Sequence, residues 1–343
     1  LQGNEPPSQI ANGGPTLTST IEGDPSQGLT LGAGGNLQYY NRATGQFFKV
    51  SPDGETKDLL SDAVYRDVRN ITWSPDGNQA ILLFPDNSKI LYNFGTQKQT
   101  TLPKELNDFS FSPNSDKIVS KFLDSSNLDN QWLMVSRPDG SQSSTAEQLG
   151  ENADKVIPLW SPNNQIIATY QESVDADHTN VIFLGAQGEN FQSATVNGRG
   201  FTPKWAPDGR RMIYSVYSAD TDDNPHLFMM NASPDTIGSG NLDLGLDVTP
   251  DKCTFSGNGI NLYCSVPYYL NPGSGPVPGL SSGIPDNLYQ INLLRGTANL
   301  IARPIDNSLN QRFSGTNLQL SPDETFLYFT DAQTGTIQKV RLR

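Results

Sequence analysis

The stretch ITWSPDGNQAILLF, residues 71–84, decides the fold class of this chain. An apolar-alternating run with Ile71 and Trp73 leads into the polar turn at 74–77, and a second run rich in strand-forming residues follows. Proline favours the first corner of a turn, aspartate bonds back to its own backbone, and glycine accepts the left-handed conformation. Two apolar runs around such a turn predict a β-hairpin.

The same turn recurs along the chain, with an aromatic residue or leucine before it and an apolar-alternating run after it. The copies are WSPDG at 73–77, FSPNS at 111–115, WSPNN at 160–164, WAPDG at 205–209, FSGNG at 255–259, LSPDE at 320–324 and a degenerate LGAGG at 31–35. Successive copies lie roughly 40–65 residues apart, a period typical of propellers and solenoids. A third strand-like run follows each copy and a weaker fourth run follows several. Blades of four short strands that pack radially satisfy this pattern, so we predict an all-β propeller.

The WSPDG turn with its alternating apolar run resembles the WD-repeat-like propeller repeats of TolB-like proteins. In that family the turn joins the two innermost strands of a blade. The resemblance covers nearly the whole chain after residue 28, and its strength lies in repetition of a short motif. It implies a propeller and adds envelope assembly to the functions to be considered. Because only the blade turns match, no partner-binding residue can be transferred.

The number of turn copies predicts seven blades of four strands, with six as the alternative if LGAGG at 31–35 is no blade turn. The chain ends at Arg343 directly after a third strand, so the last blade lacks its outer strand. We expect TLTSTIE at 16–22 to supply that strand and close the ring, which removes an exposed sheet edge.

Residues 16–343 are therefore expected to form a single propeller domain. Residues 1–15 are polar and rich in proline and glycine, which is typical of a flexible linker or stalk, although an ordinary frayed terminus explains them equally well. Since the chain starts at Leu1 and not at Met, we also expect that an upstream segment has been removed.

The charge balance excludes two classes of partner. The chain carries 36 acidic and 23 basic residues, for a net charge of −13. Nucleic acid and anionic lipid surfaces both demand a basic protein surface. No run of 18 apolar residues exists, so no transmembrane helix is expected.

The two cysteines, Cys253 and Cys264, flank TFSGNGINLY, a hairpin whose turn is centred on Asn258 and Gly259. A two-residue loop would place them opposite one another, whereas a bulged loop would place them diagonally. We expect a disulfide and hence an oxidising, extracytoplasmic compartment, with a pair of buried thiols in a cytosolic sheet as the alternative.

The search for catalytic chemistry finds no catalytic residues and no cofactor motif. The two histidines, His178 and His226, lack zinc-ligand spacing, and no nucleophile elbow or phosphate-binding loop is present. In DTDDN, the residues Asp220, Asp222 and Asn224 alternate as calcium ligands do, but the glycine and glutamate of an EF-hand are missing. Either a calcium site or a solvated acidic face explains them.

The sixth repeat contains the largest insertion, PYYLNPGSGPVPGLSSGIPD at 267–286, which begins with Tyr268, Tyr269 and Leu270. Loops of this length are usually functional or disordered. Tyrosines beside a proline-rich loop suit a recognition surface, because tyrosine contributes contact area at low entropic cost. The alternative is a loop folded over the end of the central channel.

These observations favour a non-catalytic, extracytoplasmic propeller that binds or scaffolds an envelope or surface protein, or a glycan. The alternative is a propeller enzyme of the lactonase, lyase or glycosidase kind, with carboxylates at the central channel. The predicted inner strands offer chiefly Thr72, Ser110, Pro158 and Lys204 there, and few carboxylates, which weakens the enzyme hypothesis.

Overall fold

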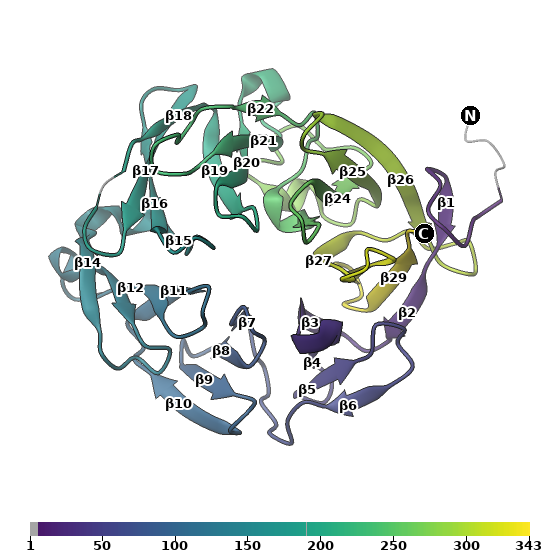
Figure 1. Ribbon diagram of the computed structural model, residues 1–343, viewed down its shortest axis with the longest axis horizontal. Helices are drawn as coiled ribbons and strands as arrows, with labels where there is room; N and C mark the ends of the chain where they lie inside the picture. The colour runs from purple at the N-terminus through teal and green to yellow at the C-terminus, as the bar shows by residue number, and fades with distance from the viewer. Residues whose placement is uncertain (1–5, 190) are drawn as a thin grey trace.

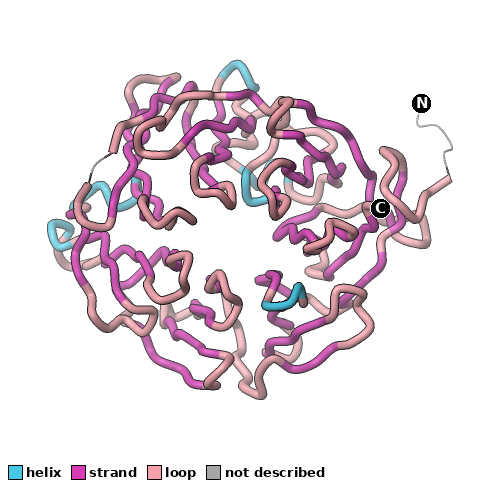
Figure 2. Tube along the Cα trace, viewed as in Figure 1, coloured by secondary structure: helices cyan, strands magenta, loops and turns pink. Residues whose placement is uncertain are grey.

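The computed structural model describes residues 6–189 and 191–343, which form a ring of antiparallel sheets around a central axis (Figure 1). Each sheet is one blade, and the prediction of a seven-bladed propeller is confirmed. The degenerate LGAGG copy is a blade turn, because it joins the first two strands of blade 1. Figure 2 shows how loops and a few short helical turns connect the strands.

The strands of blades 1 to 5 run in chain order from the inside of the ring to the outside, and blades 6 and 7 follow the same order except that β1 and β2 are added as their outermost strands. Blades 1 to 3 contain β3 (Ser26–Leu31), β4 (Leu37–Asn41), β5 (Gln46–Val50) and β6 (Lys57–Leu59); β7 (Asn70–Trp73), β8 (Gln79–Leu83), β9 (Lys89–Asn93) and β10 (Lys98–Leu102); and β11 (Leu106–Phe111), β12 (Ile118–Phe122), β13 (Trp132–Ser136) and β14 (Ser144–Gln148). Blades 4 and 5 contain β15 (Val156–Pro158), β16 (Ile166–Ser173), β17 (His178–Gly185) and β18 (Ala194–Asn197); and β19 (Arg199–Trp205), β20 (Arg211–Tyr217), β21 (His226–Asn231) and β22 (Leu242–Asp243).

The last two blades share the N-terminal part of the chain. Blade 6 contains β23 (Cys253–Phe255), β24 (Asn261–Pro267), β25 (Asp286–Asn292), β26 (Thr297–Ile305) and the added β1 (Pro15–Leu17); blade 7 contains β27 (Gly315–Leu320), β28 (Phe326–Asp331), β29 (Ile337–Arg341) and β2 (Ser19–Glu22). The short 3-10 helices are η1 (Ala33–Gly35), η2 (Leu128–Asn130), η3 (Gly150–Lys155), η4 (Ala219–Thr221), η5 (Pro250–Lys252) and η6 (Pro278–Ser281). Within the described part of the chain, no helix has the length and apolar character needed to cross a membrane.

In five of the seven blades the recurring turn holds the inner hairpin together through a buried serine, whereas blades 1 and 5 have Gly32 and Ala206 at that position. Ser74 is buried, donates to the carboxylate of Asp76 at 2.5 Å and accepts from the backbone N–H of Gln79 at 2.9 Å. The serines at the same place in blades 4, 6 and 7 make the equivalent bonds; they are Ser161, Ser256 and Ser321. Ser112 of blade 3 accepts the equivalent backbone N–H bond, but its hydroxyl donates to Asp116, two residues further along the chain. The motif is therefore a turn-forming unit.

Two of the tryptophans that precede these turns, Trp73 and Trp205, join neighbouring blades. The indole of Trp73 stacks on Phe94 of its own blade and meets Phe47 of blade 1 edge to face. Its Nε1–H donates to the carbonyl of Gly28 in the inner strand of blade 1 at 2.7 Å. Trp205 makes the matching bond from blade 5 to the carbonyl of Leu159 in blade 4. The hydrophobic core thus lies between blades, as radial packing requires.

The N-terminal segment closes the ring as predicted, because β2 pairs antiparallel with β29 and becomes the outer strand of blade 7. The segment also does more than predicted, since β1 pairs parallel with β26 and adds a fifth strand to blade 6. Ser8 and Ala11 bond to Pro15 and Arg341 through their backbones. A linker or stalk over residues 1–15 stays a prediction, and its first five residues lie outside the described part of the chain.

Candidate functional site

The ring has two faces with different loops. The face that carries the second-to-third-strand loops and the connections between blades is called the loop face here, and the opposite side, with the serine turns, is called the turn face. The long insertion at 267–286, called the tyrosine loop, joins β24 to β25 on the loop face of blade 6. The equivalent connection of blade 5 at 218–225, called the acidic loop, lies beside it.

The tyrosine loop exposes large apolar side chains. Tyr268, Tyr269, Val277 and Leu280 are 58%, 56%, 52% and 47% exposed, whereas Leu270 is half-buried. Such a concentration of exposed apolar residues in one connection is typical of an interaction site.

The base of the tyrosine loop is fixed to the propeller. The backbone N–H of Tyr268 donates to the carbonyl of Pro285 at 2.9 Å. The guanidinium of Arg312, from the connection between blades 6 and 7, lies 5.7 Å from the centre of the Tyr268 ring. Arg312 also donates to the side-chain oxygen of Asn287 at 2.7 Å. Arg312 therefore supports the Tyr268 ring, while much of that side chain stays exposed.

The tip of the tyrosine loop is bonded to the acidic loop. The N–H groups of Gly273 and Gly275 donate to the carbonyls of Asp222 and Asp223, each at 2.8 Å. A Cβ on Gly275 would lie 2.6 Å from the Asp223 carbonyl oxygen, so only glycine permits this approach. The two loops therefore form one continuous surface across blades 5 and 6.

The three predicted calcium ligands lie in the acidic loop, but they differ in environment. Asp220 and Asp222 are exposed, and Asn224 is buried, where its Oδ1 accepts from the N–H of Ser274 at 3.2 Å. Asp223 forms an ion pair with Arg199 at 3.1 Å. Across residues 6–189 and 191–343 there is no cluster of three or more histidine, cysteine or acidic side chains suited to a metal. Calcium binding by Asp220, Asp222 and Asn224 stays a prediction.

A buried ion pair supports the point where the tyrosine loop re-enters blade 6. Asp286 is fully buried and bonds Lys252 of η5 at 2.7 Å, the N–H of Gly315 at 2.7 Å and the hydroxyl of Ser265 at 2.8 Å. Burial raises the pKa of Asp286, and the charge of Lys252 opposes that shift. The sequence does not indicate this pair, because Lys252 and Asp286 come from different connections.

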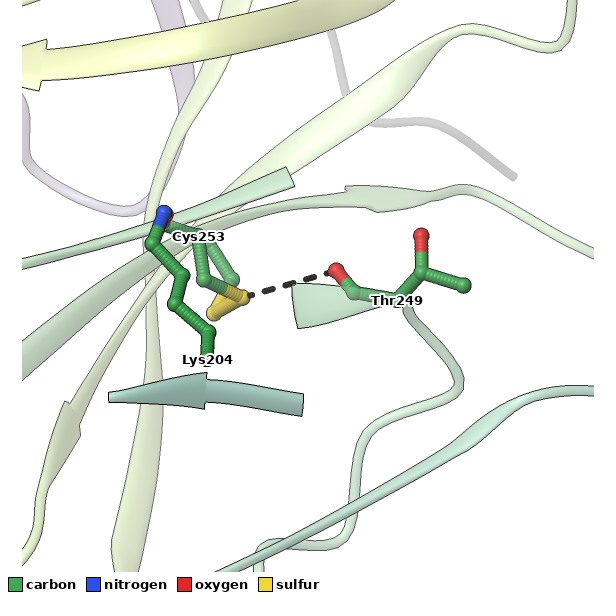
Figure 3. Close-up of a disulfide and its surroundings, with 4 residues drawn as sticks. Lys204, Thr249 and Cys253 are labelled. Carbon is green, nitrogen blue, oxygen red and sulfur yellow. Dashed lines mark hydrogen bonds between the residues drawn. A yellow bond between two sulfur atoms is a disulfide. The ribbon is translucent and has the colours of Figure 1, made fainter. Parts of the chain in front are cut away.

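The disulfide is present, and Cys253 and Cys264 lie directly opposite across β23 and β24 with their Cα atoms 4.1 Å apart. Both are fully buried. Lys204 of blade 5 donates to the carbonyl of Cys253, and the Cys253 sulfur contacts the carbonyl of Thr249 at 4.0 Å (Figure 3). Desolvation lowers the pKa of Lys204 to about 8, which Asp251 partly opposes. The disulfide thus lies where blades 5 and 6 meet.

The structure places the two histidines separately, each against acidic residues. His178 contacts Asp175 at 2.8 Å in the loop-face connection of blade 4. The imidazole of His226 lies between two carboxylates, with Nδ1 2.6 Å from Asp247 and Nε2 2.7 Å from Asp243. Hydrogen bonding to Asp247 raises the pKa of His226; burial opposes this shift and Asp243 adds to it.

A separate groove of about 430 Å³ lies between blades 3 and 4. Its apolar lining includes Leu149, Tyr170, Ile182 and Phe191, and Glu147 contributes a carboxylate. It lies in other blades than the tyrosine loop, and no sequence motif indicates it.

Comparison with known proteins shows the fold alone. No family model and no curated protein matches the chain. The β-propeller domain of Cps50 (Swd1) from Myceliophteria thermophila has a TM-score of 0.63 at 13% identity, covering 95% of this chain and 100% of that one. An oligogalacturonate lyase in complex with manganese gives 0.60 at 13% identity, covering 94% and 91%. Hydrazine synthase of Kuenenia stuttgartiensis gives 0.59 at 12% identity, covering 99% and 98%.

Proposed function

We propose that this chain is a non-catalytic, extracytoplasmic β-propeller with TolB-like repeats that binds a partner protein of the cell envelope or surface. The observation that carries the proposal is the tyrosine loop, which exposes Tyr268, Tyr269, Val277 and Leu280 from a backbone bonded at both its base and its tip. A propeller of this kind is a rigid platform, and function on such scaffolds resides in the connections.

The physical argument for binding rests on preorganisation. Association costs free energy when loops and side chains must be ordered, and a loop already fixed by its own hydrogen bonds avoids much of that cost. Tyrosine side chains give large contact areas with few rotatable bonds, and they are enriched among the residues that dominate interface energies. The surface at Tyr268 and Tyr269 combines both properties, and Leu270 beside them completes the expected contact.

The disulfide and the resemblance of the repeats to those of TolB-like proteins support an extracytoplasmic location. Disulfides form and persist in oxidising compartments and are rare in the cytosol. The Cys253–Cys264 bond therefore favours a periplasmic, secreted or cell-surface location.

The test is affinity capture from an envelope fraction of the source cells with the full-length chain as bait. We expect one or more envelope proteins to be retained by the wild type, and retention to fall at least tenfold for Tyr268→Ala/Tyr269→Ala, since two interface tyrosines typically contribute more than about 1.4 kcal/mol together.

Leu294→Ala is the matched control, because Leu294 is 71% exposed in the same blade but on the turn face. Equal loss of retention for this variant, or no partner retained at native abundance, would overturn the proposal.

A further inference from the structure

We infer that the segment of the partner that binds this surface carries basic side chains beside an apolar or aromatic anchor. This inference rests on the proposed function and adds the chemistry of the partner to it. It follows from two independent features of blades 3 to 6, namely the apolar tyrosine loop and the charge of the connections around it.

The first feature is that apolar and acidic groups share one surface. The bonds from Gly273 and Gly275 to the acidic loop hold the exposed tyrosines and the exposed carboxylates of Asp220 and Asp222 on adjoining connections of the same face. Neither carboxylate forms an ion pair with a described residue, whereas Asp223 is neutralised by Arg199. A ligand that occupies the tyrosine loop therefore meets uncompensated negative charge at the edge formed by the acidic loop, whereas the guanidinium of Arg312 lies at the base of the loop beside the Tyr268 ring.

The second feature is the charge of the exposed side chains on the loop face, from the acidic loop toward blades 4 and 3. The exposed acidic side chains there that have no ion-pair partner among the described residues include Asp129, Glu151, Asp154, Glu172 and Asp177, and Asp251 is a further one between blades 5 and 6. Of the basic residues on this face, Lys155 and Arg199 are exposed, and Lys252 and Arg312 are half-buried. The exposed charged side chains named on the loop face of these blades are thus mostly acidic.

The charge of this surface indicates which kind of partner segment binds it. Like-charged surfaces brought together at an interface cost several kcal/mol, whereas opposite charges speed association and fix the orientation of the partner. An acidic protein segment would be repelled by Asp220 and Asp222, and a neutral glycan would gain hydrogen bonds from its hydroxyl groups but no charge attraction. A segment with lysine or arginine next to an apolar anchor satisfies the carboxylates and covers Tyr268 and Tyr269 together.

The experiment uses the immobilised full-length chain and short synthetic peptides of equal length, each with one central tryptophan. One pool carries lysine at the flanking positions and the other carries glutamate, and a panel of neutral oligosaccharides is measured beside them. We expect the lysine pool to bind the wild type, and its affinity to fall about five- to tenfold in Asp220→Asn/Asp222→Asn and in Tyr268→Ala/Tyr269→Ala.

Asp235→Asn is the matched charge control, because Asp235 is exposed in the same blade but on the turn face. An equal loss of lysine-pool binding in this variant would overturn the inference by showing attraction to net charge alone. Binding of the glutamate pool or of an oligosaccharide that depends on the tyrosines and not on Asp220 and Asp222 would overturn it as well.

The same experiment separates this inference from the proposed function. If no pool binds through the tyrosine loop but envelope capture still depends on Tyr268 and Tyr269, the basic partner is wrong and the proposed function stands. If neither measurement depends on the two tyrosines, both are wrong.

Discussion

Gly77 shows why one position of the repeated turn requires a particular residue type. Its backbone has a φ of +70°, and a Cβ there would lie 2.9 Å from the side-chain oxygen of Gln38 and 3.1 Å from the Cα of Gly32. The turn of blade 2 therefore packs directly against the degenerate turn of blade 1, where Gln38 fills the space.

We predict that Gly77→Ala lowers the free energy of unfolding by about 1–2 kcal/mol, because it combines left-handed strain with a steric clash. Chemical denaturation monitored by tryptophan fluorescence measures the loss. Gly257→Ala is the control, since Gly257 has no positive φ and no atom within 4 Å of the added Cβ. Similar losses for the two variants would contradict the account of the turn.

The buried disulfide gives a second prediction at this scale. Cys253→Ala/Cys264→Ala should lower the free energy of unfolding by about 2–3 kcal/mol, because the disulfide closes a loop and so reduces the conformational entropy of the unfolded chain. Since both sulfurs are fully buried, the native protein should resist a reductant that opens the bond readily in denaturant. Alkylation followed by mass spectrometry reads this out, and rapid labelling of the native protein would contradict the burial.

Sequence reasoning predicted this disulfide because both cysteines flank one hairpin turn; it left open whether they lie opposite or diagonally, and the structure shows them opposite. The partners of Lys252 and Asp286 could not be predicted in this way, since they lie 34 residues apart in separate connections. Local hydrogen bonds leave a sequence signature, whereas contacts made by tertiary packing do not.

At the scale of elements, His226 joins β21 to the connection that follows β22. Asp243 and Asp247 face its two ring nitrogens, and the ring of Phe228 packs beside it. Two carboxylates favour the imidazolium, because only that form donates from both nitrogens.

We predict that the contacts of His226 with Asp243 and Asp247 make the free energy of unfolding depend on pH. The pKa of His226 is raised in the folded state, so its contribution is fully present below the unfolded pKa of about 6.5 and is lost as the pH rises through the higher folded pKa. The difference in unfolding free energy between the wild type and His226→Gln should therefore be larger near pH 5.5 than near pH 8.5, by the linkage relation. His178→Gln, which alters a more exposed histidine with one carboxylate partner, is the control. A difference that grows with pH would contradict the assignment.

The elements themselves show what sequence patterns can predict. Turn motifs and alternating runs located the inner hairpins and the third strands, because both signals arise within a few residues. The parallel pairing of β1 with β26 was not predicted, since strand order between remote segments leaves no local pattern. The contact between the tyrosine loop and the acidic loop was also not predicted, although the close approach of the two loops requires glycine at position 275.

At the scale of the whole molecule, the N-terminal strand β2 closes the ring by pairing with β29. Glu22 at the end of β2 is buried, accepts from the hydroxyl of Tyr39 in blade 1 at 2.6 Å and pairs with Lys57. The strand therefore covers the edge of β29 and also ties blade 7 to blade 1.

We predict that removal of residues 1–24 lowers the thermal midpoint and causes self-association, because the edge of β29 becomes free to pair with other chains. Size-exclusion chromatography with light scattering measures this. Removal of residues 1–5 leaves every described strand in place and is the control. A monomeric, equally stable product after the longer deletion would contradict the role of β2.

The central claim is that the tyrosine loop is the contact surface of a partner, and photo-crosslinking tests it most directly. A photoreactive amino acid is placed at Tyr268 in one variant and at Leu294, on the opposite face of the same blade, in another. After irradiation with an envelope fraction, the account predicts a discrete crosslinked protein from position 268 and none from position 294. Crosslinks from position 294 alone, or from neither position while the variants remain folded, would contradict it.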